Sequence, residues 1–205
     1  PAGITEQIER LEVHYLGNPD DELVFALLSD WSDAATECVP GDDELLALAT
    51  KGIGELNRRH GLAASGDRFL LLHRRRQWNA GEAKWIGWER KRGKLHELDR
   101  WLRGDTDTSF VFNEGHPTSA PSGVRYVITL DSDTRLPLGV ARRLIGKIAH
   151  PLNRPSYDCR VGRVVEGHAI LQPRITPALP LMGEGSFFQQ AFSGQGGLDP
   201  YAFAV

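Results

Sequence analysis

The apolar positions of this chain alternate between helical spacing and short continuous runs. In three segments an apolar side chain recurs every three or four residues, and unbroken apolar runs of strand length lie between them. The predicted helices include residues 4–16, 42–60 and 95–102, and the predicted buried strands cover residues 23–28 and 69–73. Gly61 and Gly104 follow the second and third helices at the position of a C-terminal cap.

A third apolar run leads directly into two acidic residues. Residues 124–130 are rich in β-branched side chains and predict a strand, and Asp131 and Asp133 follow at its end. Side chains two positions apart on an extended chain point to the same side, so the two carboxylates can converge on one cation. This stretch is therefore the candidate around which a site would be organised.

The alternation of strands and helices predicts an α/β fold with a mostly parallel, Rossmann-type sheet flanked by helices. Residues 74–88, a basic and aromatic connection, and the loop predicted at residues 105–123 are less regular. Beyond the acidic pair, Pro137 opens a helix that ends near His150, and residues 164–172 predict a further strand. Ligands of such sheets bind at the carboxyl ends of strands, which is where the acidic pair falls.

Composition and charge narrow the classes of function. Of the 205 residues 40% are hydrophobic, enough for one substantial core, and no apolar run approaches the roughly 18 residues of a membrane span. The net charge of -3 gives no support to nucleic-acid binding over the whole surface, although residues 74–103 are locally basic and favour a small anion. Cys38 and Cys159 have no His or Cys at ligand spacing, which indicates neither a zinc site nor a disulfide framework. These features predict a soluble polypeptide in a reducing, cytosolic setting.

Asp131 and Asp133 form a candidate metal site. Carboxylate oxygens are ligands that Mg²⁺ or Mn²⁺ prefers, and such a metal can hold the diphosphate of a nucleotide-sugar and act on it as a Lewis acid. The same Asp-Ser-Asp sequence is common in turns and helix caps, so the motif alone is weak. Its position after an apolar run favours the metal interpretation.

Two further segments carry candidate chemistry. Asp30 follows the apolar run at residues 23–28 and is a candidate ligand contact, whereas Asp33 fits a turn cap equally well. The basic segment from Arg90 to Lys94 suits phosphate oxygens at the start of a helix. A solvated helix face is the alternative, and we favour it for Arg90 and Arg100. Of four scattered histidines, only His96 is not assigned to a core or surface role.

Several segments, in order, resemble those of a known enzyme family. They resemble a processive family 2-type glycosyltransferase of GT-A fold and, more narrowly, the family 84 glycosyltransferase domain of cyclic β-1,2-glucan synthases. The segments that carry the wider resemblance are Gly3–Gln7, Leu27–Asp33, Lys91–His96, Thr129–Asp133 and Ile170–Pro173, and those that carry the narrower one are Glu6–Tyr15, Trp88–Leu98 and Asp199–Val205. The resemblance runs along nearly the whole chain, which makes it far more specific than the acidic pair alone.

This resemblance implies substrates, a cofactor and roles for individual residues. It implies UDP-glucose as donor, a growing β-1,2-glucan as acceptor and Mg²⁺ or Mn²⁺ as cofactor. The implied site is Asp30, Lys91 and Gly93 for the nucleotide-sugar, Asp131 and Asp133 for the diphosphate and its metal, and Gln172 for the acceptor side. It also implies a much larger protein of the bacterial inner membrane that holds this domain at the cytoplasmic face.

Parts of the family pattern fall outside residues 1–205. The pattern places a first nucleotide-binding strand before Pro1, and a catalytic carboxylate and a Gln-x-x-Arg-Trp motif after the acidic pair. Glu184 is the only acid near the expected region and is a poor candidate for the general base. We therefore expect residues 1–205 to be a fragment of a single GT-A-like domain, incomplete at both ends and inactive alone. The open sheet edge predicts self-association.

Two alternatives compete with the transferase interpretation. A haloacid-dehalogenase-type phosphatase also follows an apolar strand with Asp-x-Asp and uses the first Asp, here Asp131, as nucleophile. That motif usually carries Thr two residues after the second Asp, and here the position is Arg135. The second alternative is a non-catalytic module that binds nucleotide or glycan.

Overall fold

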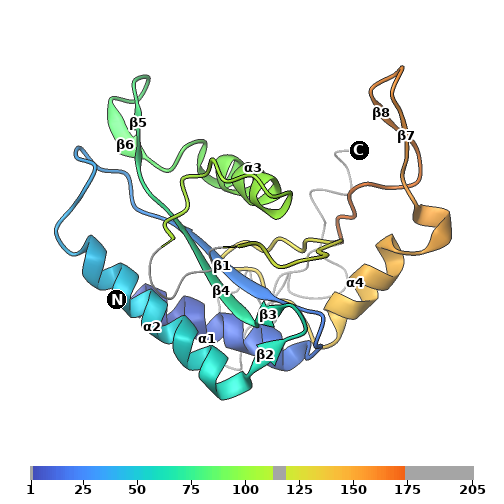
Figure 1. Cartoon of the computed structure of the whole chain (residues 1–205), viewed down its shortest axis with the longest axis horizontal. Coiled ribbons are helices and arrows are strands. Elements are labelled where there is room, and N and C mark those ends of the chain that lie inside the picture. The colour runs from blue at the N-terminus through green and yellow to red at the C-terminus, as the bar shows by residue number, and fades with distance from the viewer. Residues whose placement is uncertain (1, 113–118, 174–205) are drawn as a thin grey trace, which may run out of the picture. The chain divides into compact units, whose positions relative to one another are not determined.

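The structure, a computed structural model, describes residues 2–112 and 119–173 of the chain (Figure 1). The chain divides into two compact units, residues 1–141 and 142–205. Glu184 and the segment Asp199–Val205, which the sequence analysis used, lie outside the described residues.

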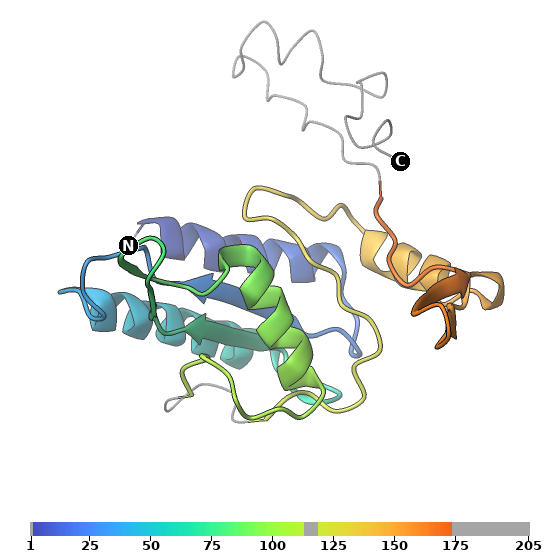
Figure 2. The same ribbon diagram turned by 90° about the horizontal axis from the view of Figure 1, so that it is seen from above.

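The first unit is built on two parallel strands, β1 (Phe25–Asp30) and β4 (Phe69–Arg74), which pair over all six residues. Helices α1 (Ala2–Gly17) and α2 (Asp42–His60) pack on one face of this pair, and α3 (Arg90–Leu102) lies on the other face (Figures 1 and 2). A short antiparallel pair, β2 (Leu62–Ala63) and β3 (Gly66–Asp67), joins α2 to β4. The result is a small three-layer α/β unit.

Alternate side chains of β4 enter the two helical layers. Phe69 and Leu71 join the cluster that contains α1 and α2, whereas Leu70 and Leu72 join the cluster that contains α3. Successive side chains of a strand point to opposite faces, and here both faces are covered by helices. This is why β4 is a continuous apolar run in the sequence rather than an alternating one.

The connection between β4 and α3 contains an antiparallel hairpin that the sequence analysis did not predict. It consists of β5 (Gln77–Asn79) and β6 (Lys84–Ile86), with Trp78 directly opposite Trp85. The Asn79 side-chain oxygen accepts hydrogen bonds from two backbone N–H groups of the turn, at 2.9 and 3.1 Å. Strands of three residues are too short to show a period-two pattern, so this hairpin left no clear signal.

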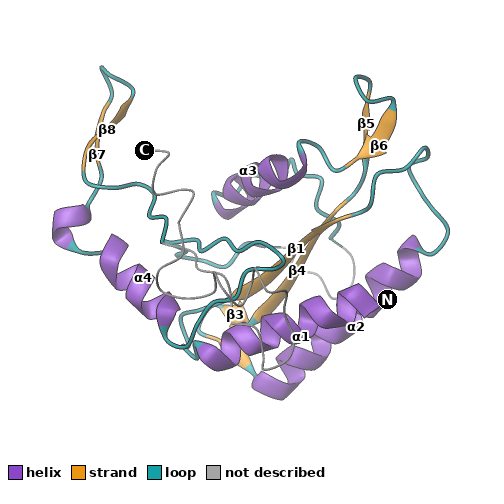
Figure 3. Cartoon of the chain, turned by 180° about the vertical axis from the view of Figure 1, so that it is seen from behind, coloured by secondary structure: helices purple, strands orange, loops and turns teal. Residues whose placement is uncertain are grey.

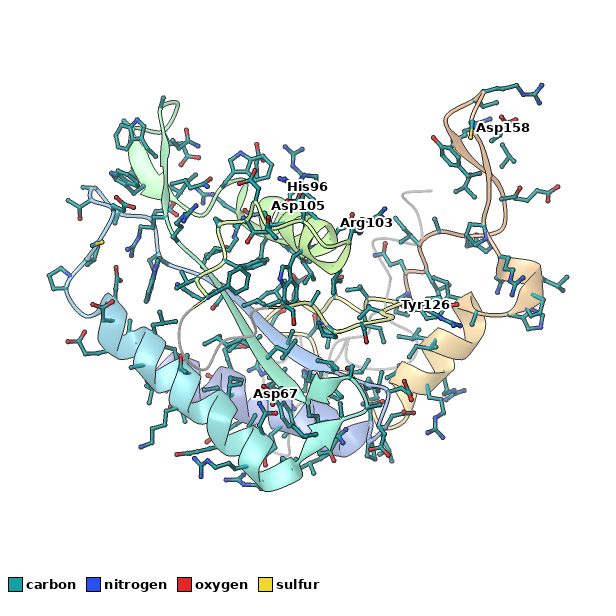
Figure 4. All side chains as sticks on the ribbon, in the orientation of Figure 1. Asp67, His96, Arg103, Asp105, Tyr126 and Asp158 are labelled. Atoms are coloured by element: carbon teal, nitrogen blue, oxygen red, sulfur yellow. The ribbon has the colours of Figure 1, made fainter. Side chains whose placement is uncertain are left out.

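The prediction of a strand at residues 124–130 is wrong. This segment is loop (Figure 3), and no described strand pairs with it. Val124, Tyr126 and Val127 are exposed (Figure 4 labels Tyr126). β-Branched residues favour an extended backbone, but a strand also needs a neighbour with which to exchange hydrogen bonds. Within the described residues β1 pairs with β4 alone, and both the open sheet edge and self-association stay predictions.

The second unit contains most of α4 (Val140–Ile148), a 3₁₀ turn (Pro151–Asn153) and an antiparallel pair, β7 (Ser156–Asp158) and β8 (Arg163–Glu166). The helix predicted after Pro137 is confirmed. The strand predicted at residues 164–172 extends only to Glu166. It ends because Gly167 has φ +71°, and a Cβ at this position would lie 1.9 Å from the Arg154 carbonyl oxygen.

The predicted α/β class is confirmed, but the parallel sheet is smaller than expected. The described strands form one parallel pair and three separate antiparallel pairs rather than one mostly parallel sheet, and the GT-A-specific features stay a prediction. Among residues 2–112 and 119–173 no helix has the length and hydropathy needed to cross a membrane. Cys38 and Cys159 are free and exposed.

Leu71→Ala is expected to destabilise the first unit by about 2–5 kcal/mol, because it leaves a cavity between β4 and α2 where the side chain is only 2% exposed. Leu62→Ala is the matched control: the same atoms are removed where the side chain is 67% exposed, so the expected change is within about 0.5 kcal/mol. Urea denaturation measures both values. Equal losses in the two variants would contradict the assignment of the core.

Candidate functional site

The carboxyl ends of β1 and β4 meet at a buried arginine. Arg74, the last residue of β4, has no exposed side-chain surface and lies opposite Asp30 in the strand register. Its guanidinium makes four hydrogen bonds: Nε donates to Asp30 Oδ1 at 2.6 Å, Nη1 to Glu97 Oε1 at 2.8 Å and to the Trp88 carbonyl at 3.1 Å, and Nη2 to the Arg90 carbonyl at 3.0 Å. One side chain therefore fixes both strands to the start of α3.

The charge of Arg74 is balanced by two carboxylates. Burial by itself lowers the pKa of Arg74, but the hydrogen bonds and negative charges of Asp30 and then Glu97 outweigh it and raise this pKa above its ordinary value. Glu97 is buried on α3 and accepts further hydrogen bonds from the backbone N–H and the hydroxyl of Ser109. The loop after α3 is thereby joined to the same network.

Asp30 serves two cations at once. While Oδ1 accepts from Arg74, Oδ2 lies 3.0 Å from Nζ of Lys94, and the Asp30 side chain is 16% exposed. The structure places this predicted nucleotide contact at the end of β1, as the sequence indicated, but gives its carboxylate a structural role as well. A ligand contact through Asp30 would use the lone pairs that the two cations leave free.

Two glycines allow the chain to approach this network. A Cβ on Gly87 would lie 2.8 Å from Cγ of Asp30, and a Cβ on Gly93 would lie 1.9 Å from the Trp88 carbonyl oxygen. Larger residues would push the loop before α3 away from Arg74. Gly93, predicted to lie near a nucleotide, thus has a packing reason to be glycine, and its contact with nucleotide stays a prediction.

The acidic turn lies against the start of α3. Lys91, in the first turn of the helix, forms an ion pair with Asp131, and both side chains are more than half exposed. Residues 131–134 form a turn in which the Thr134 N–H donates to the Asp131 carbonyl at 3.0 Å. The structure therefore brings together Lys91 and Asp131, which are forty positions apart in the sequence.

The donor set of the acidic turn fits a metal that also binds substrate oxygens. Asp131 and Asp133 are both exposed, and no group of three or more His, Cys, Asp or Glu side chains that could hold a metal ion occurs in the described part of the chain. Mg²⁺ commonly binds through one or two carboxylates together with phosphate oxygens of the substrate. Two carboxylates can serve that kind of site, but here they lie in a turn, so the side-chain alternation of an extended chain, from which their convergence was predicted, does not apply.

Gln172 and the hydrolase alternative are less well supported. Gln172 is exposed and lies beyond the end of β8, in the second unit, so it does not lie on the strand that was predicted for it. No described strand leads directly into Asp131, so the acidic pair does not lie at the end of a strand. This removes the position that a dehalogenase-type nucleophile would need, and it equally removes the strand-end position from which the sequence favoured a metal site.

The sequence analysis missed Arg74 and Glu97, on which the geometry of the site depends. Glu97 falls between apolar residues of α3, and a charge within an apolar stripe is the signal that could have identified it. Arg74 stands at the head of three consecutive arginines, and nothing in the sequence separates it from Arg75 and Arg76.

No protein-family model matches the chain. It is 50% identical over 202 residues to the cyclic β-(1,2)-glucan synthase NdvB of Rhizobium meliloti (strain 1021). The matched part is 98% of this chain and 7% of that protein, so the chain spans a small part of the relative's length. The predicted resemblance to cyclic β-1,2-glucan synthases is thereby confirmed.

Arg74→Met is expected to destabilise the first unit by about 3–5 kcal/mol, because it leaves the buried Glu97 without its cation. In a Glu97→Gln background the same substitution should cost less, since no carboxylate is then left unpaired. Arg58→Met is the control. Arg58 is 74% exposed and 3.8 Å from Glu55, so this substitution should change the free energy of unfolding by no more than about 0.5 kcal/mol. Equal costs of Arg74→Met in the two backgrounds, measured by chemical denaturation, would contradict the coupling.

Proposed function

This chain corresponds in sequence to a segment of a cyclic β-(1,2)-glucan synthase, and from that relationship we propose that it is the donor-binding part of a glucosyltransferase domain. The proposed donor is UDP-glucose, and the proposed acceptor is a growing β-1,2-glucan. The relationship supports glucan synthesis in general. The observation that carries the donor site is the ion pair between Lys91 and Asp131, which places a basic helix start beside two carboxylates.

The first turn of α3 offers two kinds of group to a diphosphate. The backbone N–H groups of Lys91 and Arg92 have no partner within the helix, whereas Arg90 donates to the Gly87 carbonyl at 2.9 Å, and Glu89, which precedes the helix, makes no side-chain cap. Lys91 and Lys94 add two ammonium groups on neighbouring turns. Because the ion pair of Lys91 with Asp131 is exposed, it contributes at most about 1 kcal/mol, and a diphosphate can take the place of Asp131 beside Lys91 at little cost.

We assign the metal to Asp131 and Asp133. Their oxygens would hold Mg²⁺ or Mn²⁺, and the diphosphate would supply further oxygen ligands. When bound, the metal would neutralise the charge that develops on the leaving UDP. Lys91 would hold the same diphosphate through its ammonium group. Asp30 is proposed to contact the uridine, Gly93 to lie near the nucleotide, and Gln172 to lie on the acceptor side.

We propose that this polypeptide binds the donor without transferring glucose. An inverting transfer needs a general base, and a carboxylate held by cations is a weak one. Asp30 and Glu97 are paired with Arg74, Asp131 is paired with Lys91, and Asp133 is assigned to the metal. An assay with UDP-glucose and glucan should therefore detect no transfer. In the larger protein, a position at the cytoplasmic face of the inner membrane stays a prediction.

Titration calorimetry of UDP-glucose into the chain should show binding that requires Mn²⁺ and is lost in chelator. Asp131→Asn/Asp133→Asn should weaken this binding by roughly tenfold or more, because two charged metal ligands are removed, each contact worth about 1.5–3 kcal/mol. Lys91→Met should weaken the binding of UDP as well as that of UDP-glucose, since it removes a contact with the diphosphate that both ligands share.

Asp67→Asn/Asp43→Asn is the matched control, because it removes the same charge from two exposed positions away from α3. Its affinity for UDP-glucose should equal that of the parent chain. The proposal fails if the acidic-turn variant and this control bind the donor equally well, or if chelator leaves binding unchanged. Binding of glucan without any binding of nucleotide would favour the non-catalytic module instead.

A further inference from the structure

A second surface of the first unit has features of a binding site that the donor site does not use. Two adjoining hollows lie on this surface: one of about 230 Å³ between the β5 strand, α3 and the loop after α3, and one of about 250 Å³ against the β5–β6 hairpin and Trp88. Both are lined by Gln77 and Trp88, which makes them neighbours on one continuous surface. We call it the tryptophan face; the first hollow also includes Arg75, His96, Arg100 and Thr108, and the second includes Trp78 and Asn79.

The tryptophan face lies on a different side of α3 from the proposed donor site. Residues advance by about 100° each around an α-helix, so His96 is about 160° from Lys94 and about 40° from Arg100. Lys94 contacts Asp30, while His96 and Arg100 line the first hollow. Figure 4 shows His96 on α3 and Asp105 in the loop after the helix. A single helix thus separates the two surfaces.

Two tryptophans on this face remain open to solvent. Trp78 is 54% exposed and Trp88 is 44% exposed. Each ring has one aromatic neighbour, Trp85 for Trp78 and His96 for Trp88, with ring centroids 6.0 Å apart in both pairs. Large exposed aromatic rings that neighbouring side chains hold in place are unusual on a protein surface and indicate a binding function.

The polar groups between the rings suit a ligand with many hydroxyl groups. The hydroxyl Oγ1 of Thr108 is buried without a hydrogen-bond partner. The Arg75 side chain is exposed and makes no hydrogen bond or ion pair with another described residue, although its backbone N–H donates to the Ser109 carbonyl at 2.9 Å. Gln77 and Asn79 add side-chain amides, which can both donate and accept. Together they offer donors and acceptors, and Arg75 adds one positive charge.

Size and charge argue against a nucleotide on this face. Each hollow is smaller than the roughly 300 Å³ at which sites for drug-sized ligands begin, and suits one six-membered ring. Arg100 is paired with Asp105 at 2.5 Å, and the hydrogen bond that Arg100 donates to Asp105 raises the pKa of Arg100, so the charge of this cation is already balanced by a carboxylate. A neutral pyranose ring, whose C–H groups stack on an indole while its hydroxyls bond to side chains, fits better than a phosphate.

We propose that the tryptophan face binds a glucan chain, with neighbouring glucosyl residues in the two hollows on either side of Trp88. The face would hold product or acceptor while the donor occupies the other side of α3. That the glucan is β-1,2-linked rests on the proposed function. The occurrence of two ring-sized hollows beside exposed tryptophans does not depend on it.

The test is tryptophan fluorescence and calorimetry of the chain with β-1,2-linked glucose oligosaccharides, without nucleotide or metal. Trp78→Ala and Arg75→Ala should each weaken the binding of the oligosaccharide by about fivefold or more, since each removes one contact of roughly 1 kcal/mol. Tyr157→Ala is the matched control: it removes an aromatic ring that is 61% exposed in the second unit and should leave the affinity unchanged.

Trp88→Ala also removes packing over Gly93, so thermal unfolding must be measured beside its affinity. Trp78→Ala, on the exposed hairpin, keeps the proposal testable if that variant does not fold. Absence of oligosaccharide binding, or equal affinities of Trp78→Ala, Arg75→Ala and Tyr157→Ala, would overturn the inference. If UDP-glucose still binds with Mn²⁺ in that case, the inference about the tryptophan face fails and the proposed function stands.

Two other outcomes would also overturn the inference. Binding of β-1,4-linked glucose oligosaccharides but not of β-1,2-linked ones would show that the face holds a different glycan. Concentration-dependent association in sedimentation that Trp78→Ala abolishes, without any binding of oligosaccharide, would show that a second copy of the chain covers these rings. Neither outcome depends on whether UDP-glucose binds at the acidic turn.

Discussion

The buried charge of Arg74 is the constraint on which the first unit depends. A guanidinium without exposed surface is stable in a protein only where carboxylates and carbonyls replace the water that it has lost. Asp30 and Glu97 supply the charge, and the carbonyls of Trp88 and Arg90 supply the remaining bonds. The requirement fixes the ends of both strands, the loop before α3 and α3 itself in one arrangement.

That arrangement gives α3 two different surroundings. On one side Lys94 reaches Asp30 and Lys91 reaches the acidic turn, so the side is rich in charges that suit a phosphate and a cation. On the other side His96 lies beside Trp88, and two exposed tryptophan rings adjoin the hollow that His96 lines. Gly93 allows Trp88 to pack closely against α3, because a side chain at Gly93 would meet the Trp88 backbone. The chemistry that we propose for the two sides follows from this division.

The sequence predicted the elements whose pattern of apolar residues lies within one segment. It failed for an element that depends on pairing with a second segment. The helices with apolar stripes and the strand at Phe69–Arg74 were foreseen, because amphipathic spacing and continuous apolar runs are properties of one segment. The strand at residues 124–130 was not confirmed, because strand formation depends on a neighbour that no described residue provides.

The site was predictable in its residue types and only partly in its contacts. The acidic pair and the basic helix start were found from sequence, but the ion pair of Lys91 with Asp131 was not. Three consecutive arginines have three different roles: Arg74 is buried among carboxylates, Arg75 is exposed, and Arg76 binds Asp42 and two backbone carbonyls. Neighbouring identical residues carry no sequence signal for such differences, because tertiary contacts alone distinguish them.

The most direct test of two ligand surfaces on one helix is hydrogen–deuterium exchange of the chain, first with UDP and Mn²⁺ and then with a β-1,2-linked glucose oligosaccharide. Nucleotide should slow exchange at residues 90–94 and 131–134, because the N–H groups of Lys91 and Arg92 have no partner within the helix and the acidic turn lies beside them. Oligosaccharide should slow exchange at residues 75–79 and 84–88. Protection of the same segment by both ligands, or of the hairpin by nucleotide, would contradict the account.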